Sequence, residues 1–103
     1  MVNKLDKKGI VQFLSDNKQI LRETFYIEQC TLVGSIANDT YTSKSDVDIV
    51  YQLIEGKNLN FNLYMQLIYW LEKNLGRSVD LINSKNINPV IKLNFSCSAQ
   101  VVI

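Results

Sequence analysis

The sequence predicts an α/β fold, a small mixed β-sheet with helices on one face. Two short segments, residues 46–51 and 78–82, alternate apolar and polar side chains as strands do. Between them, residues 61–75 repeat apolar side chains every three or four positions, which is typical of a helix packed on a core. With 103 residues, 47% of them hydrophobic, the chain can build one core but no second lobe. We therefore expect residues 1–103 to form one domain.

The N-terminal segment, residues 4–25, is predicted to be helical. Its apolar side chains fall mostly three or four positions apart: Ile10, Phe13, Leu14, Ile20, Leu21 and Phe25. Residues 15–17, Ser-Asp-Asn, are polar and favour a break into two helices, with one of the three capping the second helix.

Three strands follow from the alternation and the turn residues around them. Residues 28–33 run into a turn at Gly34, residues 46–51 come after a polar loop at 38–44, and residues 78–82 form the third strand. The helices are expected to cover the face of this sheet that carries the apolar alternate positions: Val47, Ile49, Val79 and Leu81.

Three aspartates fall on the other face of these strands. Asp46 and Asp48 are two positions apart and should share a face, because successive side chains of a strand point to opposite sides. In the third strand Asp80 alternates with Val79 and Leu81, so it should also lie on the face opposite the apolar side chains. If the second and third strands are neighbours in register, the three carboxylates converge on one open cleft. Like charges held together destabilise one another, so a cation is the simplest resident of such a cleft.

The long helix at 61–75 has recognisable ends. Asn60 can cap its start and Gly76 suits the position just past its end. Its core-facing stripe is Tyr64, Leu67, Ile68, Leu71 and Leu75. Farther along the chain, Pro89 marks the start of a final helix, and residues 100–103 are apolar enough for a terminal strand or a docked tail.

The same helix carries more aromatic side chains than one small core needs. Phe61, Tyr64, Tyr69 and Trp70 lie around more than one side of it. Either Tyr69 and Trp70 cover the edge of the core, or they belong to a surface that binds a protein, since Trp and Tyr are enriched in such surfaces.

The polar residues of this chain suit nucleotidyl transfer. Gly34-Ser35 and Asp46-Val47-Asp48 are separated by ten residues, and Asp80 comes after them. Transfer from a nucleoside triphosphate uses two divalent metal ions, and carboxylate oxygens are the hard ligands that Mg²⁺ prefers. Without a Cβ, Gly34 lets the backbone come close to phosphates, and the Ser35 hydroxyl adds a hydrogen-bonding group beside backbone N–H groups.

Composition excludes several other functions. The formal net charge is only +1, so a dedicated nucleic-acid-binding face is not expected. Without histidine there is no Ser-His-Asp triad and no His-based acid–base chemistry. We expect no membrane span and no secretory signal, and therefore a cytoplasmic protein in which Cys30 and Cys97 are buried and reduced.

Three segments together resemble the nucleotidyltransferase superfamily typified by DNA polymerase beta, and in particular its small prokaryotic branch, the minimal nucleotidyltransferases (MNT domains). They are residues 32–37 (Leu-Val-Gly-Ser-Ile-Ala), 45–50 (Ser-Asp-Val-Asp-Ile-Val) and 79–81 (Val-Asp-Leu). The resemblance runs from about residue 4 to the end. It implies that residues 1–103 are a single MNT domain with the polymerase beta-like fold.

The resemblance also implies the roles of the site residues, with two Mg²⁺ ions as cofactors and ATP as substrate. The nucleotide contacts would be Gly34, Ser35 and Ser45. The catalytic metal ligands would be Asp46, Asp48 and Asp80. Small MNT proteins are typically paired with a separate, all-helical partner of the HEPN type. In several such pairs the partner is a ribonuclease toxin and the MNT protein is its antitoxin, which transfers AMP to a tyrosine, and the resemblance implies this role here with a co-encoded partner. Whether such a chain forms oligomers with itself or with the partner is left open.

One departure from the family pattern keeps other functions open. Where relatives typically read Gly-Ser-x-Ala-Arg-Gly, residues 34–39 read Gly-Ser-Ile-Ala-Asn-Asp. Asn38 removes a cation that could neutralise phosphate, and Asp39 adds a negative charge near it. A binding module that neutralises its partner by contact alone is therefore the alternative, and a transferase for a small molecule is a further one.

Overall fold

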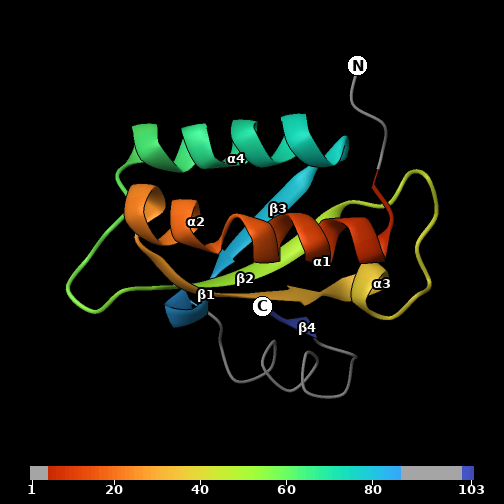
Figure 1. Ribbon diagram of the computed structural model, residues 1–103, viewed down its shortest axis with the longest axis horizontal. Coiled ribbons are helices and arrows are strands. Elements are labelled where there is room, and N and C mark those ends of the chain that lie inside the picture. Colours follow the sequence, from red (N-terminus) through yellow and green to blue (C-terminus); the bar gives the residue numbers. More distant parts are fainter. Residues whose placement is uncertain (1–4, 87–100) are drawn as a thin grey trace.

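The computed structural model describes residues 5–86 and 101–103, and these form a four-stranded sheet in the order β3-β2-β1-β4 (Figure 1). The strands are β1 (Ile27–Val33), β2 (Val47–Leu53), β3 (Val79–Asn83) and β4 (Val101–Val102). Strand β1 is antiparallel to β2 and to β4, whereas β2 and β3 are parallel. The predicted mixed sheet is confirmed, and the expected terminal segment forms its last strand.

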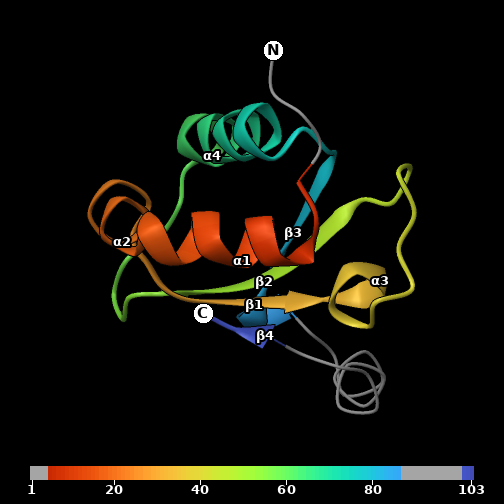
Figure 2. The same ribbon diagram turned by 45° about the vertical axis from the view of Figure 1, so that its right-hand side comes forward.

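The three longer helices lie on one face of the sheet. They are α1 (Lys7–Asp16), α2 (Lys18–Phe25) and α4 (Phe61–Leu75); a short helix, α3 (Gly34–Ala37), follows β1, and a 3-10 turn, η1 (Ser84–Asn86), follows β3. Figures 1 and 2 show α1, α2 and α4 on the same side of the strands. There Leu67 and Leu71 of α4 join Val47, Ile49 and Leu81 of the sheet in one buried core. Within the described residues, no helix combines the length and the apolar character needed to cross a bilayer.

The helix ends are set by side chains that the sequence places there. Asp6 caps α1 by accepting a hydrogen bond from the Gly9 N–H at 2.8 Å, and Asn60 caps α4 by accepting from Leu63 at 2.8 Å. Gly76 ends α4 with φ +69°, a conformation that glycine adopts without steric cost. Strand β3 begins three residues after Gly76.

Some predicted details are wrong. The predicted break between the first two helices is confirmed at Asn17, but its side chain donates to the Phe13 carbonyl at 2.8 Å instead of capping α2. Helix α1 begins at Lys7 because Asp6 is its cap. Strand β2 begins at Val47, so Asp46 belongs to the loop before the strand and does not share a strand face with Asp48. The helix predicted at Pro89 lies outside the described residues.

The aromatic side chains of α4 divide into two groups. Trp70 covers the core edge, with its ring centroid 5.2 Å from that of Phe13 and 5.8 Å from that of Phe25. Phe61 and Tyr69 are 75% and 68% exposed. The core-edge interpretation therefore holds for Trp70 and not for Tyr69.

Candidate functional site

Asp48 and Asp80 are direct partners in the ladder between β2 and β3. Their neighbours on either side, Val47 with Val79 and Ile49 with Leu81, are buried under the helices. Because side chains alternate along a strand, the two carboxylates point to the opposite face of the sheet. The expectation that these strands are neighbours in register is confirmed.

Gly34 brings the next part of the chain against this pair. Its predecessor in β1, Val33, is paired with Asp48 of β2, so the chain turns into α3 beside the carboxylate. Gly34 has φ +76°, and a Cβ built at this position would overlap Oδ2 of Asp48. Any other residue would need both a strained backbone and a shift of the Asp48 side chain, so glycine is favoured here. Ser35 is half-buried in the first turn of α3, where helical N–H groups have no intrahelical partner and suit an anionic ligand.

Asp46 reaches the site from a loop. Its side chain is exposed, and the peptide groups on both sides of it are held by the turn between α4 and β3. The Ser45 carbonyl accepts from Arg77 Nη1 at 2.9 Å, and the Val47 N–H donates to the Ser78 carbonyl at 2.8 Å. Two segments, the start of β2 with the residue before it and the start of β3, thus carry Asp46, Asp48 and Asp80 at one end of the sheet.

Ser45 is tied into the same loop through its side chain. Its hydroxyl oxygen accepts a hydrogen bond from the Thr42 N–H at 2.9 Å, and its own N–H donates to the Thr42 carbonyl at 3.2 Å. The hydroxyl proton is not used by this bond, so Ser45 can still donate to a ligand.

The carboxylates repel one another. The pKa of Asp48 is raised above its usual range, first by burial, then by the charge of Asp80 and then by that of Asp46. Among residues 5–86 and 101–103, no three acidic, thiol or imidazole side chains stand close enough to form a ready-made metal-binding group. The donor set nevertheless fits a hard divalent cation, because its atoms are carboxylate oxygens and a cation would stabilise the ionised Asp48.

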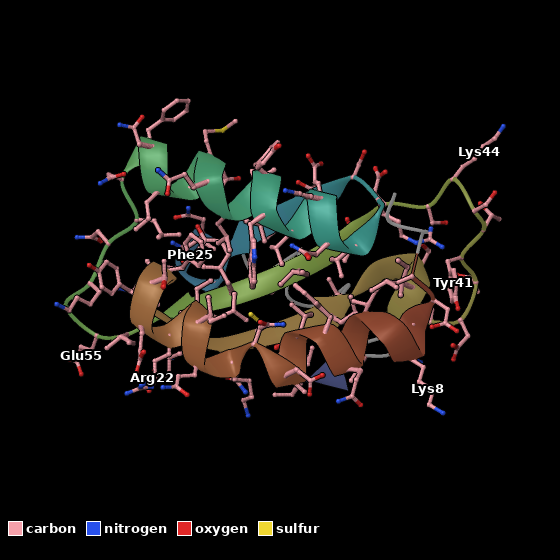
Figure 3. All side chains as sticks on the ribbon, turned by 45° about the horizontal axis from the view of Figure 1, so that its top comes forward. Lys8, Arg22, Phe25, Tyr41, Lys44 and Glu55 are labelled. Carbon is pink, nitrogen blue, oxygen red and sulfur yellow. The ribbon has the colours of Figure 1, made fainter. Side chains whose placement is uncertain are left out.

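A cavity of about 330 Å³ opens beside Asp46. It is lined by Ser43, Lys44, Ser45, Asp46, Glu72, Gly76, Arg77 and Ser78. Asp48 and Asp80 do not line it, so the predicted cleft containing all three carboxylates does not correspond to this cavity. Figure 3 shows Lys44 on the loop between α3 and β2, at the same end of the molecule as Tyr41.

Asp39, the acidic residue that follows α3 by two positions, is compensated by a lysine. Its φ is +62°, the left-handed conformation that favours glycine, and its Oδ2 lies 3.0 Å from Lys7 Nζ. The same Nζ donates to the Ala37 carbonyl at 2.9 Å. The negative charge at Asp39 therefore faces a cation from α1 and is not left unpaired.

Sequence reasoning missed Lys7 and Arg77. Lys7 comes from a helix 32 positions before Asp39, and nothing in its local pattern indicates this contact. The position of Arg77 could have drawn attention to it, because it is one of two arginines in the chain and directly follows the glycine that ends α4.

Comparison of the sequence with known families matches residues 14–102 to the nucleotidyltransferase domain family. A relative from Methanocaldococcus jannaschii, named "Putative protein adenylyltransferase", is 39% identical over 84 residues, which are 81% of this chain and 84% of that protein. The chain therefore belongs to the nucleotidyltransferase domain family, as its motifs predicted.

Solved structures share the fold. The "structure of putative minimal nucleotidyltransferase" superposes with a TM-score of 0.73 at 19% identity and covers 92% of this chain and 94% of its own. A "toxin-antitoxin with AMP-PNP" gives 0.65 at 21% identity, with 95% and 72% covered. A "tri-AMPylated Shewanella oneidensis HEPN toxin in complex with MNT antitoxin" gives 0.56 at 19% identity, with 93% and 66% covered. The predicted minimal nucleotidyltransferase fold is confirmed.

Proposed function

We propose that this protein transfers AMP from ATP to a hydroxyl group, that of a tyrosine, on a HEPN-type partner, and that it acts in this way as the antitoxin of a pair. The observation that carries the proposal is the pairing of Asp48 with Asp80 beside Gly34, which puts carboxylates next to a turn suited to phosphate. Membership of the nucleotidyltransferase family and the name of the Methanocaldococcus jannaschii relative support transfer to a protein.

The proposed cofactor is Mg²⁺, two ions held by Asp46, Asp48 and Asp80. When bound, these ions would neutralise triphosphate charge and lower the pKa of the attacking hydroxyl. Asp48, whose pKa is raised by burial and by both neighbours, is the carboxylate that gains most from a cation. Asp80 is exposed and therefore accessible from the side on which an acceptor must arrive.

The nucleotide contacts in this proposal come from three residues. Gly34 allows the triphosphate to approach the backbone, and Ser35 adds a hydroxyl and an N–H group at the start of α3. Ser45, whose hydroxyl already accepts from Thr42, is free to donate its proton to a phosphate oxygen.

The reaction itself is an in-line displacement. The acceptor oxygen forms a bond to the α-phosphorus of ATP while the bond from that phosphorus to the bridging oxygen breaks, and pyrophosphate leaves with the bonding electrons. The acceptor's proton is taken by Asp80, because the sequence has no histidine to serve as base. The product is an AMP ester of the acceptor.

In this proposal the acceptor hydroxyl is presented by another protein, which has to dock beside the carboxylates. Phe61, Met65 and Tyr69 are exposed and follow one another at four-residue intervals, which puts them on one side of α4. Such a side favours docking of a protein, since aromatic residues and Met are enriched in interfaces. A cytoplasmic location is part of this proposal, since ATP is its substrate.

The test is to incubate the chain with its co-encoded partner, Mg²⁺ and ATP and to measure the intact mass of the partner. We expect an increase by one or more AMP units with the wild type and none with Asp80→Asn, which should still bind nucleotide. An unmodified partner in the wild-type reaction would contradict the proposal.

A second candidate function is neutralisation of the partner by contact alone. The observation in its favour is the replacement of the family's Arg-Gly by Asn38-Asp39, which removes a cation from the phosphate turn. If wild type and Asp80→Asn both silence the partner without changing its mass, this second function is correct.

A further inference from the structure

Arg77 is buried at the junction between α4 and β3. Only 9% of it is exposed, and no other charged side chain in the described part of the chain is buried to this degree. Its guanidinium donates three hydrogen bonds of 2.9 Å to backbone carbonyls from two distant segments, Nε to Leu5 and Nη1 to both Thr42 and Ser45. Its central carbon also lies 5.4 Å from the centre of the Tyr41 ring.

These contacts determine where Asp46 stands. Asp48 and Asp80 are fixed by the ladder between two strands, but Asp46 lies just before β2 and has no ladder partner of its own. The peptide group that precedes it is held by Arg77 through the Ser45 carbonyl. The peptide group that follows it is held at 2.8 Å by the Ser78 carbonyl, the neighbour of Arg77 in sequence.

We propose that Arg77 is a positioning residue that fixes the loop carboxylate Asp46 at the start of β2, at the end of the sheet that carries the strand carboxylates Asp48 and Asp80. The proposal rests on the proposed function in so far as the three carboxylates bind divalent metal. A planar guanidinium can hold three carbonyls of different segments at once in a fixed geometry, which a lysine ammonium cannot reproduce. Arg77 therefore acts on the metal through the position of Asp46, without touching it.

The first test needs no metal. In Arg77→Met, amide hydrogen exchange at Ser45 and Val47 should become faster, because the loop loses two of its carbonyl anchors. Arg22→Met is the matched control, since it removes the other arginine, and Figure 3 shows Arg22 at the opposite end of the molecule from Tyr41. Unchanged exchange at both amides in Arg77→Met would overturn the proposal.

The second test measures Mn²⁺ affinity, by the signal of the free ion in electron paramagnetic resonance. Loss of a group that orients a metal ligand weakens metal binding by about 10–100-fold, and we expect a loss of this size for Arg77→Met and none for Arg22→Met. If Arg77 acts through Asp46, the loss in Asp46→Asn and in the double variant with Arg77→Met should be nearly the same. Independent, additive losses would contradict a positioning role and indicate a general effect on the fold.

The two tests separate this proposal from the proposed function. A wild-type chain that binds no Mn²⁺ contradicts the metal site, whereas the exchange measurement still decides whether Arg77 holds the loop. If Arg77→Met does not fold, Arg77→Lys replaces it, because it keeps the charge and part of the hydrogen bonding. For a folded Arg77→Lys we expect partial loss of Mn²⁺ affinity, and wild-type affinity with wild-type exchange would overturn the proposal.

Discussion

Gly34 and Asp48 are packed so closely that a single methyl group on Gly34 would overlap the Asp48 carboxylate. The contact joins the turn at the start of α3 to one of the two carboxylates paired between β2 and β3. A substitution at Gly34 is therefore expected to move Asp48 as well.

Gly34→Ala should inactivate the protein and destabilise it. The substitution introduces a Cβ both at φ +76° and against Asp48 Oδ2, and we expect a loss of at least about 2 kcal/mol in the free energy of unfolding. Gly56→Ala is the matched control, because Gly56 has φ +81° but open space around the added Cβ. It should cost only about 1 kcal/mol from backbone strain. Equal losses of stability, measured by urea unfolding, would show that the overlap with Asp48 is relieved by movement.

Asp48→Asn should abolish AMP transfer while stabilising the metal-free fold. We expect the rate to fall by at least about 100-fold, since a charged ligand is lost from the proposed metal site. The free energy of unfolding at neutral pH should rise, because the ionised form of Asp48 is disfavoured by burial and by Asp80 and Asp46. Glu55→Gln, an exposed acid at the opposite end from Tyr41 in Figure 3, is the control and should change neither quantity.

The stability gained in Asp48→Asn should depend on pH in a defined direction. The pKa of Asp48 in the folded protein lies above the ordinary value of 3.8, so the ionised group destabilises the fold at pH above that raised pKa. As the pH falls through the raised pKa towards 3.8, the wild type takes up a proton and the difference between the two proteins should shrink. Urea unfolding at several pH values measures it, and a difference that grows on acidification would contradict this assignment.

Cys30 should react slowly with alkylating reagents in the folded protein. Burial raises the pKa of its thiol from 9.0 to about 12, so almost no thiolate is present at neutral pH. The folded state therefore holds the thiol proton more tightly than the unfolded state. The contribution of this difference to the free energy of unfolding is fully present below pH 9.0 and is lost as the pH rises towards about 12. Iodoacetamide labelling with peptide mapping, in native and in denaturing buffer, tests the first statement. Rapid native labelling at Cys30 would show that it is not buried in solution.

Two adjacent aromatic residues of α4 should differ in their effect on stability. Trp70→Ala removes a ring that packs on Phe13 and Phe25, and we expect a cost of about 2 kcal/mol, below the 3–5 kcal/mol of a fully buried aromatic because Trp70 is half-buried. Tyr69→Ala, at a position 68% exposed, should cost about 0.5 kcal/mol or less. Thermal unfolding measures both, and a large loss for Tyr69→Ala would mean that its exposed ring stabilises the fold.

Much of the fold could be predicted because its signals are local. The spacing of the apolar side chains predicted the long helix and the strands. The ends of α4 could be predicted because the Asn60 side chain can accept a hydrogen bond from a helix N–H group and Gly76 can adopt a positive φ. The parity of Asp48 and Asp80 gave the face on which their carboxylates lie, because alternation along a strand is a property of the backbone alone.

The sequence by itself thus determined the elements, the face of the sheet that carries the carboxylates and the chemical types at the candidate site. Only the tertiary structure decided that Asp46 comes from a loop, that Arg77 holds this loop and that Lys7 compensates Asp39. The contacts of Arg77 with Ser45 and of Lys7 with Asp39 each join residues 32 positions apart. The local sequence around an arginine or a lysine does not indicate which carbonyl or carboxylate its side chain will contact. Such contacts exist only once the sheet and the helices are packed, because packing alone brings the donor within hydrogen-bonding distance of its acceptor.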